Sequence, residues 1–180
     1  GRVLRGSEDA SNLVYNAASN VAIALLGGPE ETTAAIHRRD PAFTSIMVRR
    51  YMLTDRKIHG DNEATAEALA AVLSRLASRT VTNLGPATAE ACRMVLTTRD
   101  DPGIGRRHSK SGSLDTLPIT RVASGWYDRD GGKPPIVYVV MIVKDGAGDA
   151  TAEQTGAKVE AAADRIAREL VVQLAGPPTP

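Results

Sequence analysis

The sequence predicts an α+β protein with an antiparallel sheet, because three kinds of pattern follow one another along the chain. Apolar residues at helical spacing dominate the chain up to about residue 98. Strand-type segments follow at 107–114, 119–127 and 136–143, and a last amphipathic segment runs over 153–174. This order, in which helices precede a run of consecutive strands, favours an α+β fold with an antiparallel sheet over alternating βαβ units.

The helical segments are defined by apolar spacing and by their ends. We expect helices at 14–26, 29–38, 65–79, 86–98 and 153–174. The first is apolar nearly all round, which is typical of a helix buried on every side. Gly27 and Gly28 end it, and Pro29 suits the first turn of the next helix. Residues 40–62 form a long polar loop, and loops of this length are often functional.

The strand segments alternate with turn signals. Residues 99–106 are expected to be a turn-rich connection, and Asp115-Thr116-Leu117-Pro118 to join two strands in a hairpin. Residues 136–143 are unbroken, apolar and mostly β-branched, which predicts a strand in the middle of a covered sheet.

Length and composition exclude several classes of protein. The 180 residues fit one domain, 1–180, and 22 basic against 21 acidic side chains give no general attraction to nucleic acid. No apolar run is long enough for a membrane span. A single cysteine, Cys92, excludes an internal disulfide and a multi-thiolate metal site, and the three histidines lack metal-ligand spacing. We therefore expect no metal and no cofactor.

The most informative stretch for chemistry is Lys110-Ser111-Gly112-Ser113 on the first predicted strand. An ammonium group stabilises anions, a serine hydroxyl can bind a carboxylate, and glycine leaves room for an acyl group along the strand. The backbone N–H of Ser113 can face an oxyanion. The alternative is that so short a motif has no chemical role and is only the solvent-exposed end of a strand.

The context of this motif resembles a known superfamily. Asn16 to Pro29, followed by Thr33 to His37, is similar to the helix pair after the Ser-Asp-Asn box of class A serine β-lactamases. Thr65 to Ala70 looks like the helix after their omega loop, and Lys110-Ser111-Gly112 falls where their Lys-Thr/Ser-Gly strand falls. The order over 14–174 resembles the β-lactamase and penicillin-binding-protein superfamily, class A-like branch.

The resemblance implies a set of site residues. The catalytic ones would be Lys110 and Ser113, the latter through its N–H. The remaining residues would form the substrate wall: Tyr15, Asn16, Ser111, Gly112 and Arg121. The substrate would be a small acyl compound such as a β-lactam, a peptidoglycan peptide or an ester.

The sequence also departs from the family pattern. No serine has a lysine three residues later, so the Ser-x-x-Lys nucleophile and the N-terminal third of the fold are expected outside this chain. Val14 stands where the family has a proton-relaying serine, and Tyr15 adjoins Asn16 directly. Counting without gaps, Arg50 stands where the family has the glutamate that activates the deacylating water, so hydrolysis of an acyl-enzyme should be slow.

These observations predict a β-lactamase-like serine hydrolase domain whose nucleophile lies outside the chain. A degenerate homologue that binds a ligand or a protein without catalysis is the alternative, and a structural half that only pairs with another chain is a third reading. Strand 136–143 is expected to be covered by another polypeptide or by a swapped copy. The family implies an extracellular or cell-envelope location, with the cytoplasm as the alternative.

Overall fold

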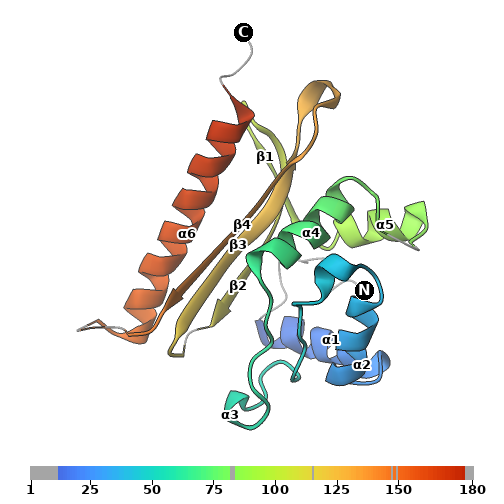
Figure 1. Ribbon diagram of the computed structural model, residues 1–180. Helices are drawn as coiled ribbons and strands as arrows, with labels where there is room; N and C mark the ends of the chain where they lie inside the picture. Colours follow the sequence, from blue (N-terminus) through green and yellow to red (C-terminus); the bar gives the residue numbers. More distant parts are fainter. Residues whose placement is uncertain (1–11, 82–83, 115, 147, 149, 177–180) are drawn as a thin grey trace. The chain divides into compact units, whose positions relative to one another are not determined.

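The computed structural model describes residues 12–81, 84–114, 116–146, 148 and 150–176. It confirms the α+β class: helices come first, then an antiparallel sheet, then a long helix (Figure 1). The chain divides into two compact units, residues 1–96 and 97–180, which we call the helical unit and the sheet unit. The expectation of one domain over 1–180 stays a prediction.

The helical unit contains short helices, of which the first two are joined by a tight turn. Positive φ angles of 98° at Gly27 and 103° at Gly28 reverse the chain between the first two helices. The Thr65 side chain caps the helix that begins at Ala66, because its hydroxyl accepts a hydrogen bond from the Ala68 N–H at 3.2 Å. The elements are α1 (Asn12–Leu25), α2 (Pro29–His37), the 3₁₀ turn η2 (Pro41–Phe43), α3 (Arg56–His59), α4 (Ala66–Ala77) and α5 (Pro86–Arg93).

The prediction that the first helix is buried on every side is wrong. On α1, Ile23 is buried, whereas Leu13, Val21 and Leu25 are 66%, 60% and 83% exposed. Periodicity alone could not show this, because an all-round apolar pattern does not say how many sides of the helix have neighbours.

The predicted long loop, 40–62, is held by polar contacts to the helices beside it. The Thr33 hydroxyl donates to the Val48 carbonyl and accepts from its N–H, at 3.0 and 2.8 Å. The Asn62 carboxamide oxygen accepts from the N–H groups of Arg49 and Arg50 at 2.9 and 3.1 Å. These contacts pair polar backbone groups of the loop between its two short helical elements, η2 and α3.

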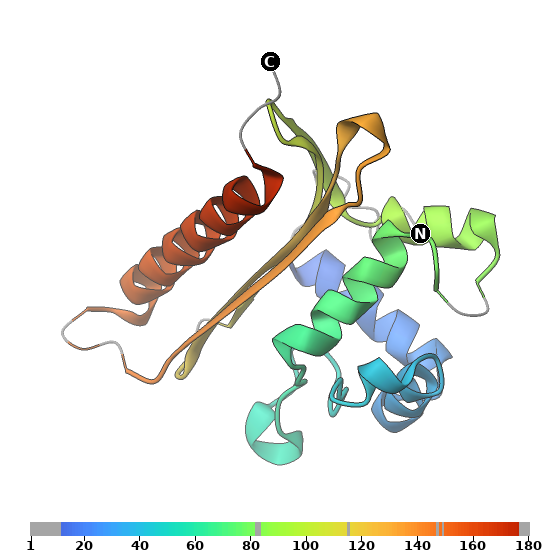
Figure 2. The ribbon, with the colours of Figure 1, turned by 45° about the horizontal axis from the view of Figure 1, so that its top comes forward.

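The sheet unit is an antiparallel sheet covered on one face by a helix (Figure 2). Its order in the described residues is β1-β2-β3-β4, and α6 packs on both β3 and β4. The elements are β1 (Thr97–Asp101), β2 (Gly105–Leu114), β3 (Ile119–Asp128), the 3₁₀ turn η3 (Asp130–Gly132), β4 (Ile136–Lys144) and α6 (Ala152–Ala175).

Two predictions about this unit need correction. The helix expected at 86–98 ends at Arg93, and residues 97–101 form β1, which pairs with Gly105 to Ser109 of β2. Strand β4, expected in the middle of the sheet, lies at an edge of the described sheet. In both cases the structure depends on whether a neighbouring strand is present, and the local sequence pattern does not show which strands will be neighbours.

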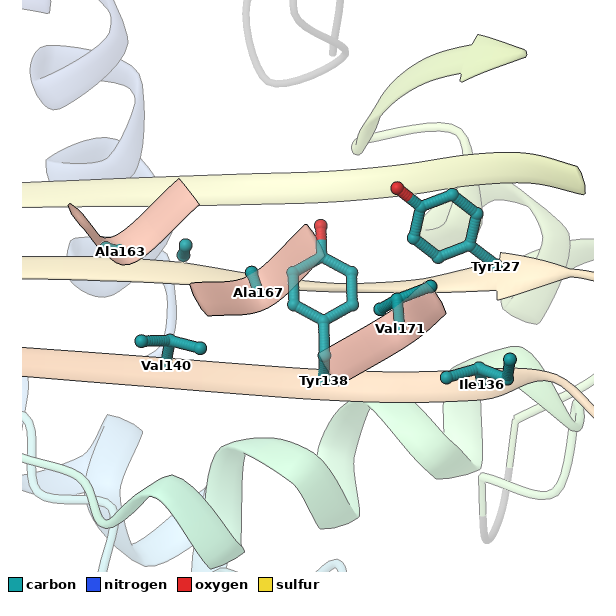
Figure 3. Packing of buried hydrophobic residues seen from close by; sticks show 8 residues of the cluster. Tyr127, Ile136, Tyr138, Val140, Ala163, Ala167 and Val171 are labelled. Carbon is teal, nitrogen blue, oxygen red and sulfur yellow. The ribbon is translucent and has the colours of Figure 1, made fainter. Parts of the chain in front are cut away.

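The core of the sheet unit lies between α6 and the last two strands. Small residues of α6, Ala163 and Ala167, let the helix approach the sheet closely. In Figure 3, Ala163, Ala167 and Val171 follow one another along the helix in the order in which Val140, Tyr138 and Ile136 lie along β4, so α6 runs antiparallel to that strand. The cluster comprises Ala123, Tyr127, Ile136, Tyr138, Val140, Ala163, Ala167 and Val171.

Candidate functional site

The Lys110-Ser111-Gly112-Ser113 motif lies on the half of β2 that β1 does not cover. The register of β1 with β2 runs from Gly105 to Ser109, whereas β3 pairs with β2 as far as Leu114. In the sheet of described residues, Ser111–Leu114 therefore has β3 as its only strand neighbour. This stretch is exposed up to Ser113 and presents an open sheet edge.

Side chains of the motif alternate between the two faces of the sheet. Ser111 lies opposite Ala123, which belongs to the core under α6, so Ser111 and Ser113 face α6. Lys110 and Gly112 face the other way. The predicted substrate wall is thus divided between two faces, which meet at the open edge of β2.

A pocket of about 300 Å³ brings the motif and Arg121 together within the sheet unit. Its lining comes from β2 and β3, from Thr97 of β1 and Tyr138 of β4, and from Glu160, Ala163 and Asp164 of α6. The polar residues that line it carry hydroxyl groups, three cations and two carboxylates: Thr97, Ser109, Ser111, Ser113, Ser124, Tyr138, Arg107, Lys110, Arg121, Glu160 and Asp164.

Lys110 is held in place by its own strand and by β3. Its Nζ donates to the Ser111 carbonyl at 2.6 Å, and its carbonyl accepts from the Ser124 hydroxyl at 2.9 Å. Burial lowers the pKa of the Lys110 ammonium below its ordinary value. A lysine with a lowered pKa gives up its proton more readily than a solvated one, which suits a group that transfers a proton.

Arg121 is buried and bound largely by the protein itself. Its Nη1 donates to the carbonyls of Leu114 and Thr120 at 3.1 and 3.0 Å, and its Nε lies 3.8 Å from the Glu160 carboxylate of α6. These contacts tie β2, β3 and α6 together at one end of the pocket. The predicted role of Arg121 in binding a substrate carboxylate therefore competes with a structural role that the contacts support directly.

Two glycines on neighbouring strands give a matched pair of variants. A Cβ on Gly125 would lie 2.1 Å from the His108 carbonyl oxygen and 3.0 Å from the Tyr138 hydroxyl, whereas a Cβ on Gly112 would meet only Val122 at 3.8 Å. We expect Gly125→Ala to lower the free energy of unfolding by about 1–3 kcal/mol, because the strands must shift. Gly112→Ala should change it by less than about 0.5 kcal/mol.

Urea unfolding followed by circular dichroism measures both variants. Equal stability of the two would mean that the sheet yields easily beside Gly125. Gly112→Ala has a second use: if ligand binding falls while stability holds, Gly112 is required for access to the pocket.

Tyr15 and Asn16, the predicted substrate-binding residues of the first box, lie on α1 in the helical unit, and the pocket of the sheet unit is formed without them. Both are half-buried. Burial raises the pKa of the Tyr15 phenol, so its hydroxyl stays protonated and can donate.

Sequence reasoning missed the residues that α6 and β4 contribute to the pocket. Glu160 and Asp164 are four residues apart and so lie on the same side of α6. The acidic pair is visible in the sequence, but its spacing does not show that this side of α6 packs beside the Lys110 strand. A second pocket, about 220 Å³, shares Arg107, Tyr138 and Asp164 with the first and extends towards Arg99.

Two general searches cover the described part of the chain. No three His, Cys, Asp or Glu side chains come together there as a set that could hold a metal ion. None of the helices formed by those residues has both the length and the hydropathy needed to cross a membrane.

Comparison with known proteins connects this geometry to one fold. No protein-family model matches the sequence, and no curated protein matches it at the sequence level. Among solved structures, the crystal structure of the class D β-lactamase OXA-427 is similar with a TM-score of 0.55, over 89% of this chain and 69% of that chain. The chain has a β-lactamase-like fold.

This likeness concerns the backbone alone, because the sequence identity is 14%. It agrees with the fold that the sequence motifs imply. The class A-like branch and the roles of the individual site residues stay predictions.

Proposed function

We propose that this chain is a β-lactamase-like serine hydrolase domain that acts on small acyl substrates: β-lactams, peptidoglycan peptides or esters. The observation that carries the proposal is the position of Lys110-Ser111-Gly112 at an open strand edge beside a pocket of about 300 Å³, within a β-lactamase-like fold. The nucleophile would be a serine outside this chain, because no serine here has a lysine three residues later.

The open edge supports an acyl substrate with an amide backbone. An extended substrate can pair with backbone groups of Ser111–Leu114 as an added strand. Lys110 would then stabilise negative charge on one side of the strand, while the serine hydroxyls offer hydrogen bonds on the other. The Ser113 N–H would face the carbonyl oxygen that becomes an oxyanion.

The test is labelling with a fluorescent penicillin, read by intact-mass spectrometry and gel fluorescence. The full chain is mixed with extracts of its source, and the labelled species is identified. The proposal predicts a covalent adduct on a serine of a polypeptide associated with this chain. Reversible binding of penicillin without any adduct would instead favour the non-catalytic alternative, and absence of both would overturn the proposal.

Slow release of the acyl group is a separate expectation, and it depends on Arg50. Its Nη2 lies 3.3 Å from Asp61 Oδ1, and its Nη1 donates to the carbonyls of Tyr51 and Thr54 at 3.3 and 3.2 Å. Position 50 therefore holds a structural cation in place of a glutamate, and the carboxylate beside it, Asp61, is paired with both Arg50 and Arg56. We expect the adduct to persist, with release measured by loss of fluorescence over time.

Arg50→Glu should fail to create a base. The change removes the three contacts and places two carboxylates together, so the free energy of unfolding should fall by about 1–3 kcal/mol. Arg49→Glu is the matched control, because Arg49 is 41% exposed and pairs only with a surface glutamate, Glu63. Arg49→Glu should lower the free energy of unfolding by about 1 kcal/mol or less. Faster release by Arg50→Glu at full stability would show that this account of the loop is wrong.

A further inference from the structure

The face of the sheet beside α6 has an apolar half and a polar half. The helix packs mainly on β3 and β4, where the core lies. On β1 and β2 the same face is formed by the odd-numbered residues, because they alternate along each strand in step with Ser111 and Ser113. Beside the helix, these strands therefore present hydroxyl and charged groups: Thr97, Arg99, Asp101, Arg107 and Ser109.

A cavity of about 220 Å³ lies where this polar half meets α6, and we call it the arginine cavity. Its three arginines come from three elements: Arg99 from β1, Arg107 from β2 and Arg168 from α6. Two carboxylates, Asp101 and Asp164, also line it, so the cavity has one positive charge in excess. These arginines lie on the β1–β2 side of α6, away from the outer edge of β4.

Asp101 positions two of the arginines. Its Oδ2 accepts a hydrogen bond from the Tyr127 hydroxyl at 2.7 Å. Arg99 Nε lies 3.4 Å from Asp101 Oδ1, and Arg107 Nε lies 3.7 Å from Oδ2. One carboxylate shared by two guanidinium groups leaves the pair with a positive charge that a further anion can neutralise.

Arg107 is the most enclosed of these two cations. Its side chain is 31% exposed, against 71% for Arg99, and its Nε is buried and makes no hydrogen bond with the described residues. Figure 3 shows Tyr138 lying across β3 with its hydroxyl directed towards β2. Burial raises the pKa of the Tyr138 phenol, so its hydroxyl stays protonated and can donate. An anion in the cavity would therefore meet both guanidinium and phenol donors.

The charge of the arginine cavity favours a carboxylate over a phosphate. Arginine can donate two parallel hydrogen bonds to either group, so geometry alone does not separate them. A carboxylate balances the single excess positive charge. A phosphate carries about −1.5 to −2 at neutral pH, and the additional negative charge would lie close to Asp101 and Asp164.

The arginine cavity continues into the larger pocket along β2. The two share Arg107 and Tyr138, and the larger pocket carries a row of hydroxyl groups from Ser109 to Ser113. Six residues separate Arg107 from Ser113, or roughly 20 Å along the strand. A molecule that places a carboxylate in the cavity can thus extend along a polar surface that is as long as a short extended peptide.

We propose that the arginine cavity binds the free carboxyl terminus of a short peptide, whose amide groups lie along the serine hydroxyls of β2. Capture of a terminal carboxylate together with backbone contacts is a known way of recognising peptides. The cavity is formed without Lys110 and requires no nucleophile, so this site goes beyond the proposed hydrolase function and does not depend on it.

The test is a titration of the ¹⁵N-labelled full chain, followed by backbone amide chemical shifts. The probes are N-acetyl-trialanine with a free carboxylate, the same peptide as its C-terminal amide, and inorganic phosphate. We expect the acid to shift the amides of Arg99, Arg107 and Arg168 in a saturable manner. The amide should bind at least about tenfold more weakly, because it lacks the charge and the paired acceptors. Phosphate should also bind more weakly than the acid.

Variants separate the arginine cavity from a general attraction to anions. Arg107→Lys keeps the charge but loses the planar fork, so the dissociation constant of the acid should rise about tenfold. Arg168→Gln, at an exposed position that tolerates change, should raise it roughly threefold. Lys158→Gln is the matched control, because it removes the same charge from an exposed position of α6 about 15 Å along the helix. It should leave binding unchanged.

Four results would overturn the proposal: no shift with the acid, equal binding of acid and amide, tighter binding of phosphate, or an equal effect of Lys158→Gln and Arg168→Gln. Shifts confined to Ser111–Leu114 would overturn it as well, since the peptide would then occupy only the open edge of β2. The titration involves no covalent step, so failure of penicillin labelling would leave its result unaffected.

Discussion

Lys110→Ala is expected to lower the rate of acylation by about 100- to 1,000-fold, or about 2.7–4 kcal/mol in activation free energy. The ammonium lies beside the open edge of β2, so it can act on charge that develops at that edge. Its removal takes away the short hydrogen bond to the Ser111 carbonyl, on an exposed part of the strand. Stability should therefore change by less than about 0.5 kcal/mol.

The measurement pairs two readouts on each variant: the rate of labelling by fluorescent penicillin, with the associated polypeptide present, and the melting temperature. Lys144→Ala is the matched control, because Lys144 is an exposed lysine at the end of another strand of the same sheet. It should leave both readouts unchanged. Equal labelling rates for Lys110→Ala and the unmodified chain would remove Lys110 from the site and favour the non-catalytic alternative.

Trp126→Ala should give the largest loss of stability among single changes in the sheet unit, about 3–5 kcal/mol in the free energy of unfolding. The side chain is 0% exposed and stacks on the His108 ring, with ring centroids 4.7 Å apart and planes 13° from parallel. Its Nε1 donates to Asp128 Oδ1 at 3.1 Å, while the other oxygen of that carboxylate lies 2.9 Å from His108 Nε2. Alanine would leave a cavity and break this network.

Trp126→Phe separates the two contributions. It keeps an aromatic ring against His108 but removes the N–H donor, so the loss should be smaller and include about 1 kcal/mol for the hydrogen bond. Urea unfolding of the three proteins, followed by circular dichroism, gives the comparison. If Trp126→Ala unfolds with the same midpoint and slope as the unmodified chain, the tryptophan has no such role in the stability of the sheet.

The sequence by itself determined the class of the fold and most of its elements. Helical spacing, Gly27 and Gly28, and Pro29 defined the first two helices to within two residues of their observed ends. The strand at 119–127 and the long last helix were also correct to within a residue or two, because their patterns repeat over many residues. The sequence could also indicate the Lys110 motif as a candidate site. An ammonium group, hydroxyl groups and a glycine on one strand suit binding or catalysis whatever position that strand has in the sheet.

The tertiary structure decided which elements are neighbours. Strand β1 exists because Thr97–Asp101 finds a partner in β2, and β4 lies at an edge although its apolar pattern resembles that of a central strand. The pocket depends on Glu160 and Asp164, which reach the motif only when α6 packs on the sheet. The local sequence determines the backbone preference of a segment and the polarity of each of its faces. Strand pairing and helix packing join residues that are far apart in the chain, and the energy of each such contact depends on both partners.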